Sequence, residues 1–387
     1  MKKIGLFLGP KPSGGEFQYY LTMIDAVGTL PTDQYTVVFG YTSNIWVDYL
    51  TGYIQQKVAL PSGFLSKSLS LLWTRTGMPM GIWRKICPLF DPMAKALLKE
   101  NCDIWIFPYP TARSFQIPVP ALVSIHDLMH RYEKRFKESA SSWEFFCRER
   151  NLTNICRWSK GVIVDSKIGQ QHVQECYEME SERIHTLPYI PPRYMHNETP
   201  PGFDKRYILP EKYLFYPAQF WEHKNHKKLI EAAILLKGKL PDLKLVFTGA
   251  THNAYDSAVQ LVRENNLVDN VTFLGYVPNE DMPEIYRRAR ALVMPTFYGP
   301  TNIPPLEAFV AGCPVAVSAI YAMPEQVGDA ALLFNPESVT DIADCIVKLW
   351  TDDEVCADLV KKGKMRVSDW GQRQFNERLL QIIGEVP

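Results

Sequence analysis

The sequence of 387 residues lacks a net charge, because 42 Lys and Arg residues balance 42 Asp and Glu residues. A polyanion-binding protein usually carries a basic excess, so nucleic acid is not expected as a partner. No stretch approaches the roughly 18 uncharged apolar residues of a membrane span. The apolar start, residues 4–9, is too short for a signal peptide and runs into Pro-Lys-Pro. We therefore predict a buried first strand and a cytoplasmic protein.

Several catalytic and metal-binding patterns are also missing. The eight cysteines form neither a CxxC pair nor a zinc-type spacing with histidine, which favours buried, reduced thiols. There is no Walker loop, no GxGxxG fingerprint, no Ser-His-Asp order and no DxD-like pair at a strand end. We therefore predict no metal site and no cofactor.

Short β-rich runs alternate with helical patterns along almost the whole chain. Runs such as LKLVFTG and ALVMPT are apolar on both faces, as in sheets that helices cover on both sides. This alternation predicts an α/β protein with parallel sheets and right-handed crossovers. The strands expected in the first half are 4–9, 35–41, 57–60, 104–108, 121–126, 161–165 and 183–187. Those expected in the second half are 213–218, 244–248, 271–276, 291–295, 314–317 and 331–334.

The length favours two domains. Segment 191–206 is polar, rich in proline and without periodicity, which is typical of a linker. We therefore predict two doubly wound, Rossmann-like domains, 1–195 and 207–370, with a linker at 196–206 and a C-terminal helix, 371–387, that packs back on the first domain. Because open α/β sheets bind ligands at the carboxyl ends of their strands, the domains are expected to face each other across a cleft.

The strongest chemical signal is segment 295–308, in which a buried strand, a Gly/Pro loop and a helix start follow one another. Asn302 can cap the helix, and prolines suit its first turn. A helix N-terminus suits a diphosphate or a sugar hydroxyl. Glu307, about one turn into the helix, could accept hydrogen bonds from both hydroxyls of a ribose. It could equally complement the helix dipole.

The second signal is the cationic segment 220–228, at a strand end and a helix start. Lys224 is placed to meet phosphate oxygens as a point charge. The alternative is a solvated basic helix start. Cations are unfavourable at a helix N-terminus unless an anion is bound there, so we favour phosphate binding.

Three further motifs are weaker. His126 ends an expected strand and is followed by Asp127, so it could bond to a transferring sugar or an acceptor, although a histidine there is more often structural. Gly14 and Gly15 open the first helix and could let backbone amides approach a phosphate, or they could form a plain loop. Glu325 could touch a donor or pair on the surface.

Taken in order, these motifs resemble family 4 of the retaining glycosyltransferases, which have the GT-B architecture. The resemblance covers essentially the whole chain. Its most specific part is GPTNIPPLEA, an AGCPVAVS-type turn and strand, and MPEQVGDAALLFNP. IHDLMHRYEKRF is similar to the family's His-Asp loop, and YPAQFWEHKNHKKLIEA is similar to its phosphate-binding segment.

The resemblance implies residue roles. Glu307 corresponds to the second Glu of the family's Glu–seven residues–Glu motif, which holds the donor ribose. Lys224 corresponds to the Lys that neutralises the donor diphosphate, and His126 to the His near the anomeric carbon. Gly14 and Gly15 correspond to the glycine loop beside the diphosphate.

The sequence departs from the family pattern at two positions. Gly299 stands where the motif's first Glu is found, which affects how the donor sugar is held. Gln219 stands where the family usually has an Arg, which removes one cation from the diphosphate site. The functions lost are expected to pass to neighbouring groups of the same two loops, namely His223, Asn225, Thr301, and the backbone amides of Asn302 and Ile303. The resemblance thus implies a variant donor site.

The reaction implied by the resemblance is transfer of a hexosyl unit, with retention, from a nucleoside diphosphate sugar. Mannose or rhamnose, on a GDP-linked donor, is favoured. The acceptor is expected to be a glycan or lipid-linked glycan in bacterial surface polysaccharide synthesis, bound by the N-terminal domain. Alternatives are a sugar-nucleotide epimerase or hydrolase, which would need carboxylates at the sugar, and a non-catalytic GT-B scaffold subunit.

Residues 64–99 mix basic with aromatic and aliphatic side chains, and this composition suits a helix at the inner face of the cytoplasmic membrane. The apolar members are Leu71, Leu72, Trp73, Ile82, Trp83, Ile86, Leu89 and Phe90, and the basic members are Lys67, Arg75, Arg84, Lys85 and Lys95. Ordinary packing around the sheet is the other interpretation, and we favour it.

Overall fold

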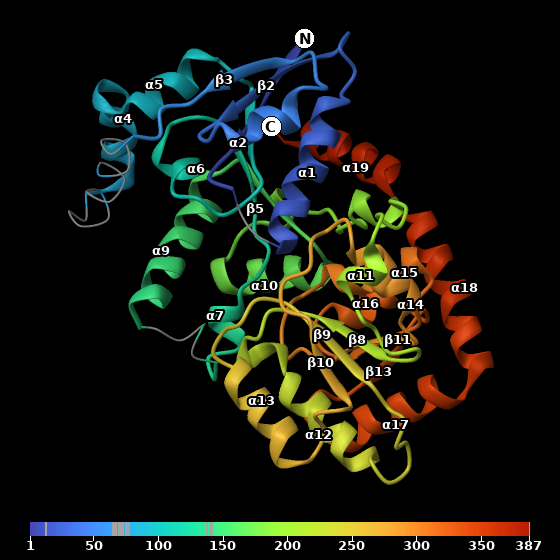
Figure 1. Ribbon diagram of the computed structural model, residues 1–387. Coiled ribbons are helices and arrows are strands. Elements are labelled where there is room, and N and C mark those ends of the chain that lie inside the picture. The colour runs from blue at the N-terminus through green and yellow to red at the C-terminus, as the bar shows by residue number, and fades with distance from the viewer. Residues whose placement is uncertain are drawn as a thin grey trace. The chain divides into compact units, whose positions relative to one another are not determined.

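The computed structural model describes residues 1–11, 14–63, 68, 73, 78–136, 138 and 142–386. The chain divides into two compact units. Unit 1 comprises Met1–His130, Ser141–Pro188 and Gln372–Pro387. Unit 2 comprises Arg131–Ala140 and Tyr189–Gly371. The chain thus passes from one unit to the other more than once (Figure 1).

Unit 1 contains, among its described residues, a parallel sheet of seven strands in the order β3-β2-β1-β4-β5-β6-β7. Central strands such as β4 and β5 are buried along their whole length, which explains their uninterrupted apolar sequences. The strands are β1 (Lys2–Leu8), β2 (Tyr35–Tyr41), β3 (Gln56–Ala59), β4 (Ile104–Phe107), β5 (Ala121–Ser124), β6 (Gly161–Val164) and β7 (Ile184–Thr186).

The helices of unit 1 begin where the sequence supplies caps. Asp91 accepts a hydrogen bond from the Met93 amide and Pro92 is the first residue of α5, while Ser166 caps α10 through the Gly169 amide. The helices are α1 (Gly14–Gly28), α2 (Ile45–Leu50), α4 (Met80–Phe90), α5 (Pro92–Lys99), α6 (Arg113–Gln116), α9 (Ser142–Trp158), α10 (Lys167–Tyr177), η1 (Ser181–Arg183) and α19 (Gln372–Glu385). Helix α7 (Met129–Tyr132) spans the point where the chain leaves unit 1.

The C-terminal helix α19 belongs to unit 1 and packs beside α1 (Figure 1). Its apolar side chains Phe375, Leu379 and Ile382 are completely buried. The Asn376 amide also donates to the Thr29 hydroxyl at 3.0 Å. The chain therefore returns at its end to complete the core of its first unit.

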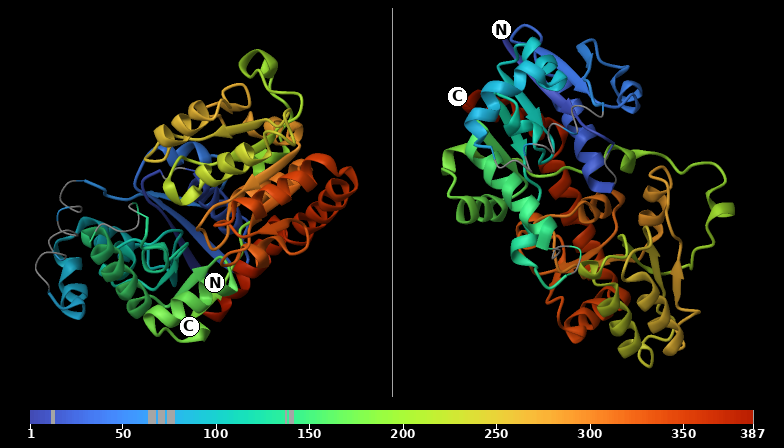
Figure 2. Two further views of the ribbon diagram at one scale, coloured as in Figure 1. Left: turned by 90° about the horizontal axis from the view of Figure 1, so that it is seen from below. Right: turned by 90° about the vertical axis from the view of Figure 1, so that its left-hand side faces the viewer.

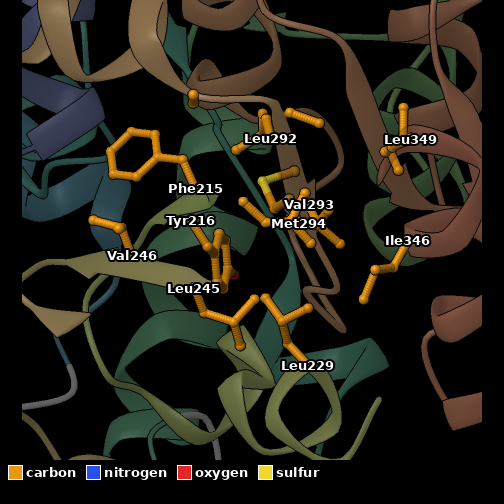
Figure 3. Packing of buried hydrophobic residues seen from close by; sticks show 14 of the residues in the cluster. Phe215, Tyr216, Leu229, Leu245, Val246, Leu292, Val293, Met294, Ile346 and Leu349 are labelled. Carbon is orange, nitrogen blue, oxygen red and sulfur yellow. The ribbon is translucent and has the colours of Figure 1, made fainter. Parts of the chain in front are cut away.

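Unit 2 contains a parallel sheet of six strands in the order β10-β9-β8-β11-β12-β13 among its described residues. Phe215, Leu245 and Val293 are buried side chains of this sheet (Figure 3), and Ile346 and Leu349 of helix α17 belong to the same cluster. The strands are β8 (Leu214–Pro217), β9 (Leu245–Thr248), β10 (Val271–Phe273), β11 (Ala291–Met294), β12 (Val315–Ser318) and β13 (Leu332–Phe334).

Helices cover both faces of this sheet (Figure 2). Helix α12 packs beside α13 and α17, whereas α15 packs beside α14 and α18. The helical elements of unit 2 are η2 (Arg193–His196), α11 (Phe203–Arg206), η3 (Glu222–Lys224), α12 (His226–Leu236), α13 (Tyr255–Glu264), α14 (Met282–Arg288), α15 (Ile303–Ala311), α16 (Met323–Val327), α17 (Val339–Thr351) and α18 (Asp353–Asp369).

The expected α/β fold is confirmed, since each strand predicted from the sequence has a counterpart in one of two parallel sheets. The linker assignment needs a correction. Segment 196–206 is part of unit 2, and the division of the chain falls between Pro188 and Tyr189. Phe203 is buried there, and Arg206 forms an ion pair with Asp281 at 2.6 Å, so the segment is packed despite its prolines. Among the described residues, none of the helices combines the length and the apolar character needed to cross a membrane.

The buried face of α19 gives a stability prediction. Phe375→Ala is expected to lower the free energy of unfolding by about 3–5 kcal/mol, because it removes a fully buried ring and leaves a cavity. Urea titration followed by tryptophan fluorescence measures the change. The matched control is Arg373→Ala on the same helix, whose side chain is 78% exposed and which should change stability by less than about 0.5 kcal/mol. Equal effects of the two variants would show that α19 does not contribute to the core.

Candidate functional site

The loops that follow β8 and β11 are tied to each other at the carboxyl edge of the unit 2 sheet. The two strands are neighbours, so their ends lie side by side. The Phe297 amide donates to the His223 carbonyl at 2.7 Å, and the Asn225 side-chain amide donates to the Pro295 carbonyl at 2.7 Å. Asn225 adopts the left-handed conformation, with φ of 60°, which asparagine tolerates better than most residues. Its amide, expected at the donor, therefore has a structural task in this loop.

Lys224 and Asn302 are brought together by these loops. The Lys224 ammonium lies 3.4 Å from the side-chain oxygen of Asn302, the residue immediately before helix α15. Gln326 holds the backbone of Asn302 on both sides, accepting from its amide at 2.9 Å and donating to its carbonyl at 2.7 Å. A half-buried cation beside a helix N-terminus is suited to bind an anion.

The first turn of α15 presents fewer donors than a helix start usually does. Pro304 and Pro305 have no N–H group, so Ile303 and Leu306 carry the only amides among the first four helical residues. Thr301, expected to contact the donor, is buried in the loop before them. The helix dipole remains, but the hydrogen bonds to a phosphate must come largely from Lys224 and the loops.

Gly299 has a backbone that explains the missing acid of the sequence motif. Its φ is +121°, in the region that disfavours residues with a side chain. A Cβ atom there would lie only 2.5 Å from Nδ2 of the Asn302 side chain. The Asn302 side chain thus fills the space into which a side chain at position 299 would project. Gly299 and Asn302 together replace the acidic side chain of the family motif.

Glu307 is buried, and tyrosine hydroxyls bond to both of its carboxylate oxygens. Tyr286 donates to one oxygen at 2.5 Å and Tyr194 donates to the other. Burial raises the pKa of Glu307, and the two tyrosine hydrogen bonds oppose this shift. Each carboxylate oxygen can accept more than one hydrogen bond. The hydrogen bonds of Glu307 described here go to these two tyrosines.

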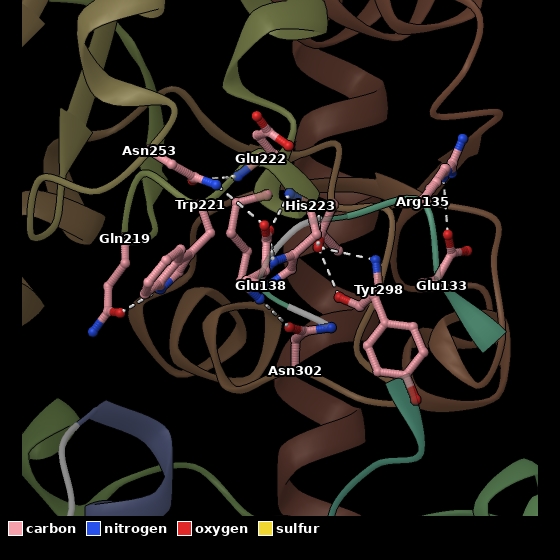
Figure 4. Close-up of polar contacts among 12 residues, drawn as sticks. Glu133, Arg135, Glu138, Gln219, Trp221, Glu222, His223, Asn253, Tyr298 and Asn302 are labelled. Carbon is pink, nitrogen blue, oxygen red and sulfur yellow. Dashed lines mark hydrogen bonds and ion pairs between the residues drawn. The ribbon is translucent and has the colours of Figure 1, made fainter. Parts of the chain in front are cut away.

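His223 pairs with an acid that sequence reasoning missed. The Glu138 carboxylate accepts from the His223 ring at 2.7 Å and from its backbone amide at 3.1 Å (Figure 4). The other Glu138 oxygen accepts from Asn253 at 3.2 Å. Burial alone would raise the pKa of Glu138, but the hydrogen bonds from His223 and Asn253 hold it below the usual value. The negative charge of Glu138 therefore offsets any positive charge on the His223 ring.

The segment that carries Glu138 belongs to unit 2 although it follows the first-half His-Asp loop in sequence. Phe136 stacks on Phe297 with ring centroids 5.5 Å apart, and the Arg135 guanidinium lies 4.4 Å from the Phe297 ring. Glu133 accepts from the Tyr321 hydroxyl at 2.7 Å. These contacts attach the described residues of segment 131–138 to the loops after β11 and β12.

Gln219 does not replace the charge of the family's arginine. Its side-chain oxygen accepts from the Trp221 indole at 2.9 Å (Figure 4). Trp221 also stacks on His252, with ring centroids 3.8 Å apart. Because the side-chain oxygen of Gln219 bonds to Trp221, the NH₂ group is the part of this side chain that can donate to a further group. Lys224 is therefore the principal cation of the two loops, since His223 is paired with Glu138.

Unit 1 holds the remaining expected residues, Gly14, Gly15 and His126. Gly14 starts helix α1 with φ of 60°, and a Cβ atom there would meet no other atom within 4 Å. The His126 Nε2 atom lies 2.8 Å from the Pro108 carbonyl, which can only accept, so Nε2 carries the hydrogen. Burial lowers the pKa of His126, so the ring is neutral at pH 7 and Nδ1 is an acceptor.

Four residues of the site escaped the sequence analysis: Glu138, Tyr194, Tyr286 and Gln326. Each contacts a predicted residue from a distant point in the sequence, which leaves no local signal. Gln326 alone lies within a recognised motif, MPEQVGDA, in which Glu325 is the predicted residue. Glu325 is exposed, and Gln326 is the residue that reaches the helix start.

The basic and aromatic segment 64–99 lies partly outside the described residues, including Lys67, Leu71, Leu72 and Arg75. Trp73 and Trp83 are buried, as the packing interpretation predicts. Ile82 and Leu89, on α4, are 52% and 73% exposed. Contact with a membrane remains a prediction.

Two parallel, Rossmann-like sheets and their loops define the class of the protein, a GT-B glycosyltransferase fold. The chain superposes on the Anabaena protein Alr3699/HepE in complex with UDP and glucose, with a TM-score of 0.73 at 15% identity over 99% of this chain and 100% of the other. It also superposes on sucrose-phosphate synthase from Thermosynechococcus elongatus, with a TM-score of 0.69 at 17% identity over 100% and 99% of the chains.

Residues 204–366 match the family Glycosyl transferases group 1. The chain is 30% identical to O-antigen chain mannosyltransferase B of Escherichia coli over 53% of its length and 55% of that protein. It is 24% identical to mannosylfructose-phosphate synthase of Agrobacterium fabrum over 64% of its length and 59% of that protein. The chain spans about half the length of the curated relatives it matches. The expected GT-B fold is confirmed, and the second half of the chain is similar to glycosyltransferases in sequence.

The arrangement at Gly299 predicts that the missing acid cannot simply be restored. Gly299→Glu is expected to lower the free energy of unfolding by about 1–3 kcal/mol, because the residue would occupy a left-handed backbone and clash with Asn302. Adding Asn302→Ala should recover part of this loss by removing the clash. The control is Gly238→Glu, where a Cβ atom meets nothing within 4 Å. Thermal unfolding measures all three, and an undisturbed Gly299→Glu variant would contradict the account.

The Glu138 pairing predicts a pH dependence. Because the folded-state pKa of Glu138 is depressed, its contribution to stability is present above the unfolded value of about 4.3 and is lost as the pH falls through the folded pKa. The stability difference between wild type and Glu138→Gln should therefore be largest at neutral pH and shrink below about pH 4. Urea titrations of both proteins across this range measure the difference. A difference that is constant with pH would argue against the pairing.

Proposed function

We propose that this chain is a retaining hexosyltransferase of the family 4 type, and that it transfers mannose from a GDP-linked donor. Rhamnose is the second candidate sugar. The observation that carries the proposal is the Lys224–Asn302 pair at the start of α15, within a domain of the group 1 glycosyltransferase family. The relatives named as O-antigen mannosyltransferases support the choice of sugar.

In this proposal the donor diphosphate binds between the loops that follow β8 and β11. Lys224 and the α15 dipole stabilise the negative charge that grows on the diphosphate as the bond to the anomeric carbon breaks. Gln219 donates a hydrogen bond in place of the arginine charge. Glu307, held by Tyr194 and Tyr286, accepts hydrogen bonds from the ribose hydroxyls. No metal ion is required.

The acceptor oxygen attacks the anomeric carbon from the face that the diphosphate leaves, so the configuration is retained. The proton of the acceptor hydroxyl passes to the departing phosphate oxygen. His126, which is neutral, accepts a hydrogen bond from a hydroxyl near the reacting carbon. The acceptor is proposed to be a glycan or lipid-linked glycan of a bacterial surface polysaccharide, which would bring the protein to the inner face of the cytoplasmic membrane.

Lys224→Ala tests the proposal. It is expected to lower kcat/KM for transfer from GDP-mannose by about 100-fold or more, because it removes the cation that faces the leaving diphosphate. The control is Lys227→Ala, a neighbouring lysine that is 72% exposed and should leave the rate unchanged. A chelator should not reduce the wild-type rate if the reaction needs no metal. Near-normal transfer by Lys224→Ala would refute the assignment.

A panel of nucleoside diphosphates and their sugars identifies the donor. Ligand binding to the folded state raises the melting temperature, so a selective shift with GDP and then with GDP-mannose is expected. Measuring released nucleotide with and without acceptor separates transfer from hydrolysis.

A further inference from the structure

Unit 1 contains a cavity of about 290 Å³ where the start of α1, the His-Asp loop and helix α9 meet. Its lining residues are Glu16, Tyr109, Pro110, His126, Asp127, Arg148, Asn151 and Leu152. Small-molecule sites run from roughly 300 to 1,000 Å³, so this cavity suits one sugar ring rather than an extended chain. It contains His126, the residue proposed to lie near the reacting carbon, but none of the residues that face the donor in unit 2.

The wall of the cavity is chemically suited to a sugar. It combines a tyrosine ring with carboxylate, guanidinium, amide and imidazole groups, which together accept from and donate to hydroxyls. Tyr109 contributes the aromatic ring of this lining. Asp127 is fixed in place, since one of its oxygens accepts from the Met129 amide at 2.9 Å and from Arg148 at 3.0 Å.

The charges of the cavity do not balance. Among the described residues that line it, Arg148 is the one cation, and it is paired with Asp127. Arg113, near Tyr109, is paired with Asp91 at 2.7 Å. Glu16 therefore adds a second carboxylate to a cavity whose cation is already neutralised. Desolvation and the Asp127 charge raise the pKa of Glu16.

We propose that this cavity binds the acceptor as an uncharged hexose ring, and that Glu16 is the residue that excludes acceptors with a carboxylate or phosphate at this position. A neutral sugar donates its hydroxyl protons to Glu16 and Asp127, whereas an anionic sugar meets the uncompensated Glu16 charge. Like charges at close range repel one another, and the exposure of Glu16 moderates this repulsion through screening by water. The inference rests on the proposed transferase function and adds the class of acceptor.

The test compares two sugars that differ in one group, methyl α-D-mannopyranoside and its uronate, binding to the full chain. Dissociation constants are measured by ligand-observed NMR and by titration calorimetry. Wild type is expected to bind the neutral glycoside at least about tenfold more tightly than the uronate. Glu16→Gln, which keeps the size of the side chain, should reduce this ratio to about twofold or less. Glu16→Lys should invert it, and Glu182→Gln, an exposed acid of unit 1, should leave it unchanged.

Equal binding of both sugars to wild type would overturn the proposal, as would an unchanged ratio in Glu16→Gln or no binding of either sugar. The donor side gives an independent reading. If GDP binding and the loss of turnover in Lys224→Ala hold while the sugar ratio fails, only the acceptor class is wrong. If nucleotide binding fails as well, the transferase function itself is wrong.

Discussion

The hydrogen bonds between the loop after β8 and the loop after β11 are the constraint on which the donor side of unit 2 depends. They join the Phe297 amide to the His223 carbonyl and the Asn225 side chain to the Pro295 carbonyl. Because these bonds involve backbone groups, they fix the course of both loops. The position of Lys224 beside Asn302 follows from this course. A cation and a helix N-terminus would otherwise be separate features of two unrelated loops.

The same constraint explains how the site differs from the family pattern without losing its order. At position 299 the left-handed backbone leaves no room for an acidic side chain, and Asn302 fills the space. Gln326 then holds Asn302 from the neighbouring helix α16. At position 219 a glutamine bonded to Trp221 takes the place of a charge. Both residues that depart from the family pattern are thus in contact with neighbouring groups of the same segments.

Each unit contains an ion pair beside its candidate binding residues. In unit 2, His223 pairs with Glu138. Lys224 is therefore the cation that we propose for binding the diphosphate. In unit 1, Arg148 pairs with Asp127, and Glu16 is the second carboxylate of the cavity. The proposed substrates, a negatively charged donor and an uncharged acceptor, are chosen to fit these two environments. His130 is the last residue of its segment in unit 1. The segment that carries Glu138 begins at the next residue, Arg131, and belongs to unit 2.

Periodicity and strand-end motifs in the sequence were sufficient for the two parallel sheets, for each strand, and for Lys224, Glu307 and His126 as candidates. These features are local, since a buried strand is uniformly apolar and a ligand loop follows its carboxyl end. Tertiary structure alone decided that Tyr194 and Tyr286 hold Glu307, that Glu138 pairs with His223, and that Asn302 blocks position 299. It also showed that segment 196–206 packs onto unit 2. Each of these facts joins residues far apart in the chain, and such a pairing depends on how the strands are ordered in the sheet, which no local pattern records.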